Sequence, residues 1–192
     1  ARESTTGTAG ADLMRGGAER MVETPPEAQP RSTTTGPVSA AAADLSRFTR
    51  ISMGALGADD CDLAGRMLPQ KLTAAISYGV KQLTASFRDL VVRHADPRPT
   101  KIGGAVLESR TVQLAWPRAG TAFEVRSALC RADARTMGIE HWMIDPATGR
   151  KIGYSEAIAV VFYIDQRRIV PISSTAQAEL GRHLVASAGP AT

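Results

Sequence analysis

Cysteine is scarce in this chain of 192 residues, which holds two, Cys61 and Cys130. They show no metal-binding spacing, and two cysteines make no disulfide framework. We therefore expect free thiols, no metal site and a reducing, cytoplasmic compartment. Cys61 has no neighbouring His or Lys in the sequence to lower its pKa, so we interpret it as a packing residue and not as a nucleophile.

Long apolar runs and a strong excess of one charge are also lacking. No apolar stretch approaches the ~20 residues of a membrane span, and no segment has the charged-then-apolar pattern of a signal peptide. The 23 Lys and Arg against 19 Asp and Glu leave a net charge of +4, which is too small an excess to indicate nucleic-acid binding. We expect no membrane and no nucleic-acid partner. The mild positive charge is compatible with an anionic small molecule.

The first 44 residues lack any aromatic side chain and are rich in Ser, Thr, Gly, Pro and Ala. A segment of this composition cannot bury enough apolar surface to offset the entropy lost on ordering. We predict a disordered N-terminal tail over residues 1–44, a single domain over residues 45–184 and a flexible C-terminus over residues 185–192.

A long amphipathic helix is the clearest predicted element. From Arg66 to Leu90, apolar residues recur every three or four positions with basic residues between them. Pro69 fits the first turn of a helix, where a missing N–H does no harm, and Asp96–Pro99 ends it. The other predicted elements are five strands and a short final helix: Phe48–Leu56, Ile102–Trp116, Thr121–Ala134, Met137–Ile144, Ile152–Ile164 and the helix Ser173–Leu184.

Side chains alternate along the later strands, so each strand has two distinct faces. Three of these faces are Phe123, Val125, Ser127 and Leu129; Met137, Ile139, His141 and Met143; and the small residues Gly153, Ser155, Ala157 and Ala159. Strands joined by tight turns after one helix predict an α+β fold, in which an antiparallel five-stranded sheet wraps around one long helix. One helix cannot cover both faces and the edges of such a sheet, so we expect a homodimer or a homotetramer.

The loop Asp60-Cys61-Asp62-Leu63-Ala64-Gly65 runs straight into the predicted helix. It places carboxylates beside the unpaired N–H groups and the positive dipole end of that helix. A carboxylate nucleophile or base next to an anion-stabilising helix terminus suits acyl transfer. The plainer interpretation of Asp62 is a helix N-cap, and we interpret Asp60 as a loop or capping residue.

Residues 45–172 resemble the hot-dog fold thioesterases, specifically the branch related to 4-hydroxybenzoyl-CoA thioesterase. The loop Asp60–Gly65 resembles that branch's Asp-x-Asp-x-x-Gly motif before the central helix. Gly153–Asp165 followed by Arg167-Arg168-Ile169-Val170-Pro171 is similar to the family's last long strand and its proline-containing exit. The resemblance implies hydrolysis of an acyl-CoA thioester to a free carboxylic acid and CoA, with no metal and no organic cofactor.

The resemblance also implies roles for particular residues. Asp62 is the implied catalytic carboxylate, acting as a nucleophile on the thioester carbonyl or as a base on water, and the backbone N–H groups of Met67 and Leu68 are the implied oxyanion site. The implied substrate-binding residues are Gly65, Arg66 and Ser155. Many relatives carry His where this chain has Arg66, and Arg cannot act as a base near neutral pH. We expect Arg66 either to pair with Asp62 and lower its pKa or to reach a phosphate.

Two other functions stay open at this point. The replacement of His by Arg66 suggests a non-catalytic hot-dog module that binds an acyl-CoA or an acyl-carrier partner. A hot-dog dehydratase or hydratase needs an Asp/His or His/Glu pair. We interpret His141 as a structural histidine and His94 with Asp89 as a solvated pair, so this function ranks last.

Overall fold

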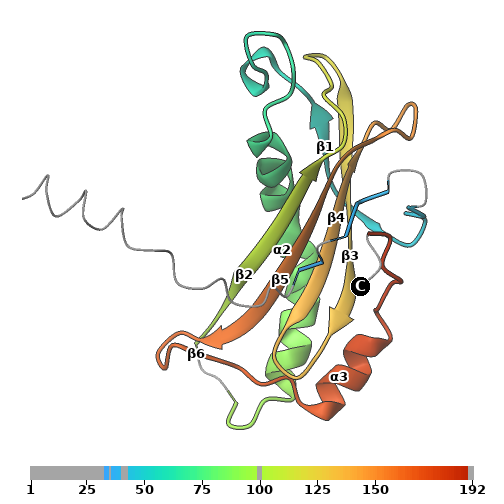
Figure 1. The fold of residues 1–192 in the computed structure, drawn as a ribbon. Coiled ribbons are helices and arrows are strands. Elements are labelled where there is room, and N and C mark those ends of the chain that lie inside the picture. Colours follow the sequence, from blue (N-terminus) through green and yellow to red (C-terminus); the bar gives the residue numbers. More distant parts are fainter. Residues whose placement is uncertain (1–32, 35, 40–42, 99–100, 190–192) are drawn as a thin grey trace, which may run out of the picture. The chain divides into compact units, whose positions relative to one another are not determined.

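The computed structural model describes residues 33–34, 36–39, 43–98 and 101–189, so residues 1–32 of the predicted tail lie outside the described part. Figure 1 shows the succession of elements. The elements are β1 (Thr49–Ala55), the 3-10 helix η1 (Ala58–Asp60), α2 (Gln70–Arg93), β2 (Ile102–Gln113), β3 (Ala122–Ala132), β4 (Met137–Ile144), β5 (Lys151–Tyr163), β6 (Arg168–Ile169) and α3 (Ser174–Gly181).

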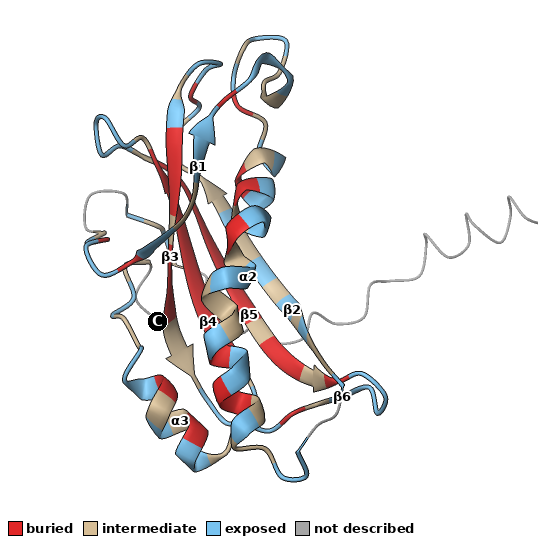
Figure 2. Cartoon of the chain, turned by 180° about the vertical axis from the view of Figure 1, so that it is seen from behind, coloured by how far each residue is buried: buried red, intermediate tan, exposed pale blue. Residues whose placement is uncertain are grey.

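The strands form one antiparallel sheet in the order β1-β3-β4-β5-β2, and the short β6 pairs with β5. β4 lies in the middle of the sheet and is buried along its whole length. Figure 2 shows α2 lying across one face of this sheet. The predicted fold class is confirmed: a single α+β domain with an antiparallel sheet around one long helix. The described residues include no helix that is long and apolar enough to span a membrane.

Helix α2 begins at Gln70 and not at Arg66 as predicted. The residues before it are extended, because Arg66 and Met67 form isolated β-bridges with Arg118 and Cys61. Pro69 is the N-cap. Contacts with a loop distant in the sequence therefore override the helical pattern of this segment.

Helix α2 packs closely against β1, the strand at one edge of the sheet. A Cβ built on Gly79 would overlap the carbonyl group of Ile51, only 2.5 Å from its carbon. One turn earlier in the helix, the Ser52 hydroxyl donates to the carbonyl of Ala75 at 2.8 Å. Only a residue without Cβ allows the two backbones to approach this closely.

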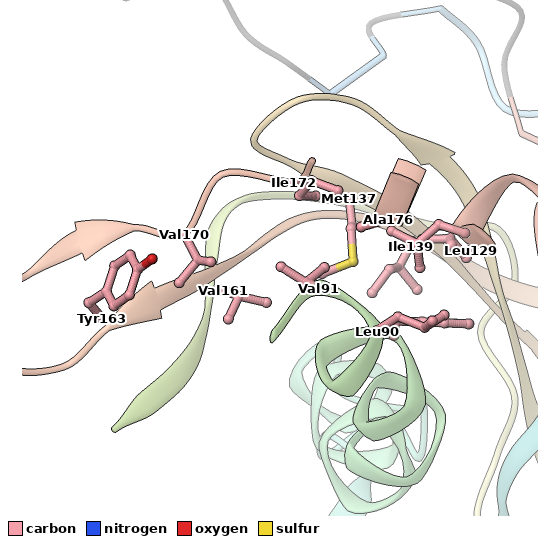
Figure 3. Packing of buried hydrophobic residues seen from close by; sticks show 12 residues of the cluster. Leu90, Val91, Leu129, Met137, Ile139, Val161, Tyr163, Val170, Ile172 and Ala176 are labelled. Atoms are coloured by element: carbon pink, nitrogen blue, oxygen red, sulfur yellow. The ribbon is translucent and has the colours of Figure 1, made fainter. Parts of the chain in front are cut away.

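Apolar clusters hold both ends of α2. Near the helix start, Leu72 and Ala75 pack with Phe123 and Val125 of β3. Near the helix end, side chains from α2, the sheet and α3 form the larger cluster of Figure 3: Phe87, Leu90, Val91, Leu129, Met137, Ile139, Val161, Tyr163, Val170, Ile172, Ala176 and Leu180. The position of α2 is thus fixed along its whole length.

The segment before β1 covers part of the sheet face that points away from α2. The N–H and the hydroxyl of Thr34 each donate to the buried Glu156 at 2.8 Å. Arg110 donates to the carbonyls of Thr34 and Gly36 at 2.8 and 2.7 Å. The packed domain therefore begins before Leu45, and the predicted boundary is too late.

The segment after α3 makes similar contacts on the same face. Glu140 lies opposite Glu156 in the register of β4 and β5. It accepts hydrogen bonds from the Ser187 hydroxyl and from the N–H groups of Ala188 and Gly189. Residues 185–189 of the predicted flexible C-terminus are therefore bound to the sheet, and residues 190–192 lie outside the described part.

Candidate active site

Asp62 sits in a tight loop between η1 and α2. Its N–H donates to the carbonyl of Arg66 at 2.8 Å, and Gly65 donates to the carbonyl of Asp62 at 2.8 Å. Gly65 adopts a φ of 73°, which favours glycine. Asp60 pairs with Lys71 at 2.8 Å and accepts from the Gly57 N–H at 2.9 Å. Of the predicted alternatives for Asp60, a loop or a capping residue, the structure shows capping, because its carboxylate binds the N-cap N–H of η1. The backbone holds Asp62 in one conformation.

Both oxygens of the Asp62 carboxylate have partners within the loop. Its Oδ1 accepts from the N–H groups of Ala64 and Arg66, both at 2.9 Å. Its Oδ2 accepts a hydrogen bond from Arg66 Nε at 3.0 Å, and Arg66 Nη2 lies 3.0 Å from the same oxygen. The Arg66 N–H and then its side chain hold the pKa of Asp62 below its ordinary value. The predicted ion pair is confirmed. Asp62 does not cap α2, because its bonds stay within the loop.

Both predicted oxyanion donors are already engaged. The Met67 N–H donates to the carbonyl of Pro117 and the Leu68 N–H to the carbonyl of Asp60, each at 2.8 Å. This corrects the prediction, since these amides hold the loop against its neighbours. In the first turn of α2, Lys71 donates to the Leu68 carbonyl at 3.0 Å. Among the described residues, the Gln70 N–H at the helix start has no such partner.

A cavity of about 600 Å³ lies between α2 and the half of the sheet that the helix does not touch closely. Its volume is in the range of small-molecule sites. Its walls come from α2, β2, β4 and β5: Thr73, Ile76, Ser77, Val80, Lys81, Thr84, Arg88, Gly104, Ala105, Val106, Ser109, Thr111, Met137, Ile139, His141, Ser155, Ala157, Ala159, Val160 and Val161.

Of the predicted site residues, Ser155 lines this cavity, whereas Asp62, Gly65 and Arg66 lie together in the loop at the helix start. The small residues of β5 thus have two effects. Gly153 allows Leu72 to approach the sheet, because a Cβ there would lie 2.8 Å from Leu72 Cδ2. From Ser155 onward the small side chains leave open space.

His141 is the cavity residue that the sequence interpretation set aside. It is only 2% exposed, and its Nδ1 shares a 2.7 Å hydrogen bond with the hydroxyl of Ser127. Burial lowers the pKa of His141 to about 4, so the ring is neutral at physiological pH. Its structural role is confirmed by the bond to Ser127, and its place in the cavity wall is an additional feature.

The other histidine and cysteine candidates from the sequence provide no catalytic group. His94 pairs with Glu179 of α3 at 2.9 Å and not with Asp89, so the predicted solvated pair is wrong. Cys61 and Cys130 are free thiols, and burial raises the pKa of Cys130 to about 12, which makes it unreactive. The described residues contain no cluster of His, Cys, Asp and Glu suited to a metal.

Neither protein-family models nor curated protein sequences match this chain. Several solved structures do resemble it. A protein assigned as an oleoyl thioesterase from Lactobacillus plantarum has 18% identity, covers 74% of this chain and has a TM-score of 0.55. This chain spans only 54% of that protein's length.

Two further structures match over nearly their whole length. The 1,4-dihydroxy-2-naphthoyl-CoA thioesterase of Synechocystis has 11% identity and a TM-score of 0.52, with 69% of this chain and 98% of that chain covered. A Staphylococcus aureus protein in complex with CoA has 12% identity and a TM-score of 0.56, with 73% and 89% covered. At such low identities these likenesses show the fold, which is the hot-dog fold that the sequence resemblance implied.

Proposed function

We propose that this protein hydrolyses an acyl-CoA thioester to a free carboxylic acid and CoA. The observation that carries the proposal is an ionised carboxylate, Asp62, fixed in a loop at the start of the central helix, with a ligand-sized cavity along that helix. Solved hot-dog structures whose names include thioesterase support this reaction class.

In the proposed reaction, Asp62 acts in one of two ways. As a nucleophile, its carboxylate oxygen attacks the thioester carbonyl, CoA leaves as thiolate, and water then hydrolyses the acyl anhydride. As a base, it takes a proton from the water that attacks the carbonyl directly. We propose the Gln70 N–H as donor to the developing oxyanion, because it is the first-turn amide without a partner in the described residues.

The surface beside Asp62 suits the nucleotide part of CoA. The Arg66 guanidinium lies 6.0 Å from the ring centre of Trp116, and Trp116 is 53% exposed. Arg118 donates to the carbonyl of Ala64 at 3.2 Å from the same side of the loop. Guanidinium groups bind phosphates and an exposed indole offers a stacking surface. We therefore place CoA on this surface and the acyl group in the cavity.

We also propose a homodimer, or a tetramer built from it, through the exposed edge strand β2. Val106 and Leu107 are 59% and 58% exposed on that strand, and Val106 also lines the cavity. A second copy paired to this edge would cover apolar surface and close the cavity wall. Light scattering should give the mass of two or four chains, and Val106→Lys should lower it. A monomer at all concentrations would contradict the proposal.

The direct test of function is thiol release from short, medium, long and aromatic acyl-CoAs by the full chain. We expect turnover of at least one class, with free acid and CoA formed in equal amounts. A folded protein that releases no thiol from any member of the panel would contradict the proposal.

The pH dependence of kcat/KM should show no ionisation between about pH 5 and pH 7. Asp62 must be ionised to act, and its lowered pKa extends the ionised range downward, so activity is lost only at more acidic pH. His141, with a pKa of about 4, does not titrate in this interval either. A rate profile from pH 4 to pH 8 on a folded sample checks this. An inflection near pH 6 would assign the reaction to another group.

A binding module without turnover is the second candidate. Two observations favour it: the Met67 and Leu68 amides are engaged, and Arg66 occupies one oxygen of Asp62. Such a module would bind an acyl-CoA, or an acyl group on a carrier protein, and release it unchanged. Calorimetric binding of a thioester that the protein does not hydrolyse would select this candidate.

A further inference from the structure

A row of polar side chains crosses the floor of the cavity. Ser127, His141, Ser155 and Thr111 lie opposite one another on the neighbouring strands β3, β4, β5 and β2. Ser127 bonds to His141, and Thr111 Oγ1 lies 3.1 Å from Ser155 Oγ. The last three of these residues line the cavity. On β3, β4 and β5 the neighbouring positions of this face are apolar or small, whereas Ser109 on β2 adds a further polar side chain to the cavity wall.

His141 presents one unpaired ring nitrogen in this row. Its Nδ1 is bound by Ser127, and Nε2 makes no hydrogen bond with any residue in the described part of the chain. Nε2 lies at the end of the ring away from the backbone, so a ring in the cavity wall offers that atom to a ligand. A buried polar atom without a partner is stabilised when a ligand supplies its hydrogen bond.

The row is built for a neutral oxygen and not for an anion. His141 is neutral, as its lowered pKa shows, and the other members are hydroxyl groups. The Ser127 hydroxyl can donate to Nδ1 or accept from it, so Nε2 is free to accept or to donate in turn. A hydroxyl or a keto oxygen satisfies these requirements.

The row lies near the helix start. Beyond it the sheet side of the cavity becomes apolar, while Lys81, Thr84 and Arg88 of α2 line the opposite wall. Gly153 faces Leu72 at the start of α2, while Val161 belongs to the same apolar cluster as Phe87 near its end, so β5 runs alongside α2 in the same direction. Ser155 follows two residues after Gly153, or about 7 Å further along the strand. Past Ser155 the floor continues with apolar side chains: Ala157, Ile139, Ala159, Met137 and Val161.

We propose that the cavity selects an aliphatic acyl group that carries a hydroxyl or keto oxygen within its chain. His141 Nε2, Ser155 and Thr111 bind that oxygen, and the tail beyond it fills the apolar end. This inference rests on the proposed function, which places the acyl group in the cavity. An unsubstituted chain would leave the polar row unpaired, and a compact aromatic group would leave the apolar end empty.

The test compares dodecanoic acid with its monohydroxy and mono-oxo isomers, each titrated calorimetrically into the full native chain. Binding of free acids requires no hydrolysis, so the result is independent of Asp62. The variants are Ser155→Ala and Thr111→Val, which remove a hydroxyl with little change of shape. The matched control is Ser86→Ala, whose hydroxyl bonds to the Leu83 carbonyl on an exposed part of α2. Thermal unfolding verifies the fold of each variant.

We expect at least one substituted isomer to bind about tenfold more tightly than dodecanoic acid. This preference should fall to about twofold or less in both cavity variants and persist in Ser86→Ala. Equal affinities for all acids, no binding of any acid, or a preference that survives in both cavity variants would each overturn the proposal. If the native chain showed no preference among the acids but kept Asp62-dependent hydrolysis, this inference would be removed and the proposed function would stand.

Discussion

Asp62→Asn should lower kcat/KM for the best thioester substrate by about 10²–10⁴-fold, the range typical for loss of a catalytic acid or base. Asn keeps the carbonyl oxygen that accepts the N–H groups of Ala64 and Arg66, so the loop should keep its conformation. What Asn lacks is the negative charge that attacks the carbonyl or deprotonates water. We expect the loss in kcat, with KM little changed.

Asp59→Asn is the matched control for this substitution. Asp59 belongs to the same loop region, in η1, and is exposed. The same chemical change there should leave kcat/KM within about twofold of the native value, as for surface substitutions in general. Equal losses in both variants would indicate a general effect of charge near the loop and would contradict the assignment of Asp62.

Gly79→Ala should lower the free energy of unfolding by about 2 kcal/mol. Overpacking costs about 1–3 kcal/mol, and overlap with the backbone carbonyl of Ile51 lies at the upper end because a backbone group cannot rotate away. The better helix propensity of Ala returns about 1 kcal/mol. Urea unfolding followed by circular dichroism measures the difference.

Gly181→Ala tests the same exchange at a position with free space. Gly181 is the last residue of α3, and no atom lies within 4 Å of a Cβ built there. We expect its free energy of unfolding to stay within about 1 kcal/mol of the native value. If Gly79→Ala proved as harmless as this variant, the close approach of α2 to β1 would be wrong.

Local sequence patterns predict an element of the fold well where neighbouring residues determine its ends. The predicted strand Met137–Ile144 has the bounds of β4, because a short, mostly apolar run ends at the Asp145–Gly149 turn. The start of α2 was misplaced, since Arg66 and Met67 also fit the helical period. Their actual conformation depends on Pro117 and Arg118, which no local pattern reveals.

The domain boundaries predicted from composition were also displaced, because they too depend on contacts distant in the sequence. Thr34 and Ser187 belong to segments without a hydrophobic pattern, and their order comes from hydrogen bonds to Glu156 and Glu140. In the sequence, a charged residue within a strand indicates the solvent-exposed face, so Glu156 and Glu140 give no sign of a bound segment. Only the fold brings the terminal segments onto that face, so composition alone favours disorder.

The polar row was partly visible in the sequence. Each of three consecutive strands has one polar residue interrupting a face of apolar or small side chains: Ser127, His141 and Ser155. What the sequence could not supply is the register that aligns them, because a shift by two residues would separate them without changing any face. Asp62 is proposed from its motif, whereas the bonds that engage the amides of Met67 and Leu68 follow only from the fold.

One measurement tests the central claim most directly: binding and thiol release, recorded on the same acyl-CoA, for native protein and Asp62→Asn side by side. The account predicts that both proteins bind the thioester with similar affinity and that only the native protein releases thiol at a substantial rate. Equal hydrolysis by both would remove Asp62 from the reaction. Binding by both without thiol release from either would show a binding module in place of a hydrolase.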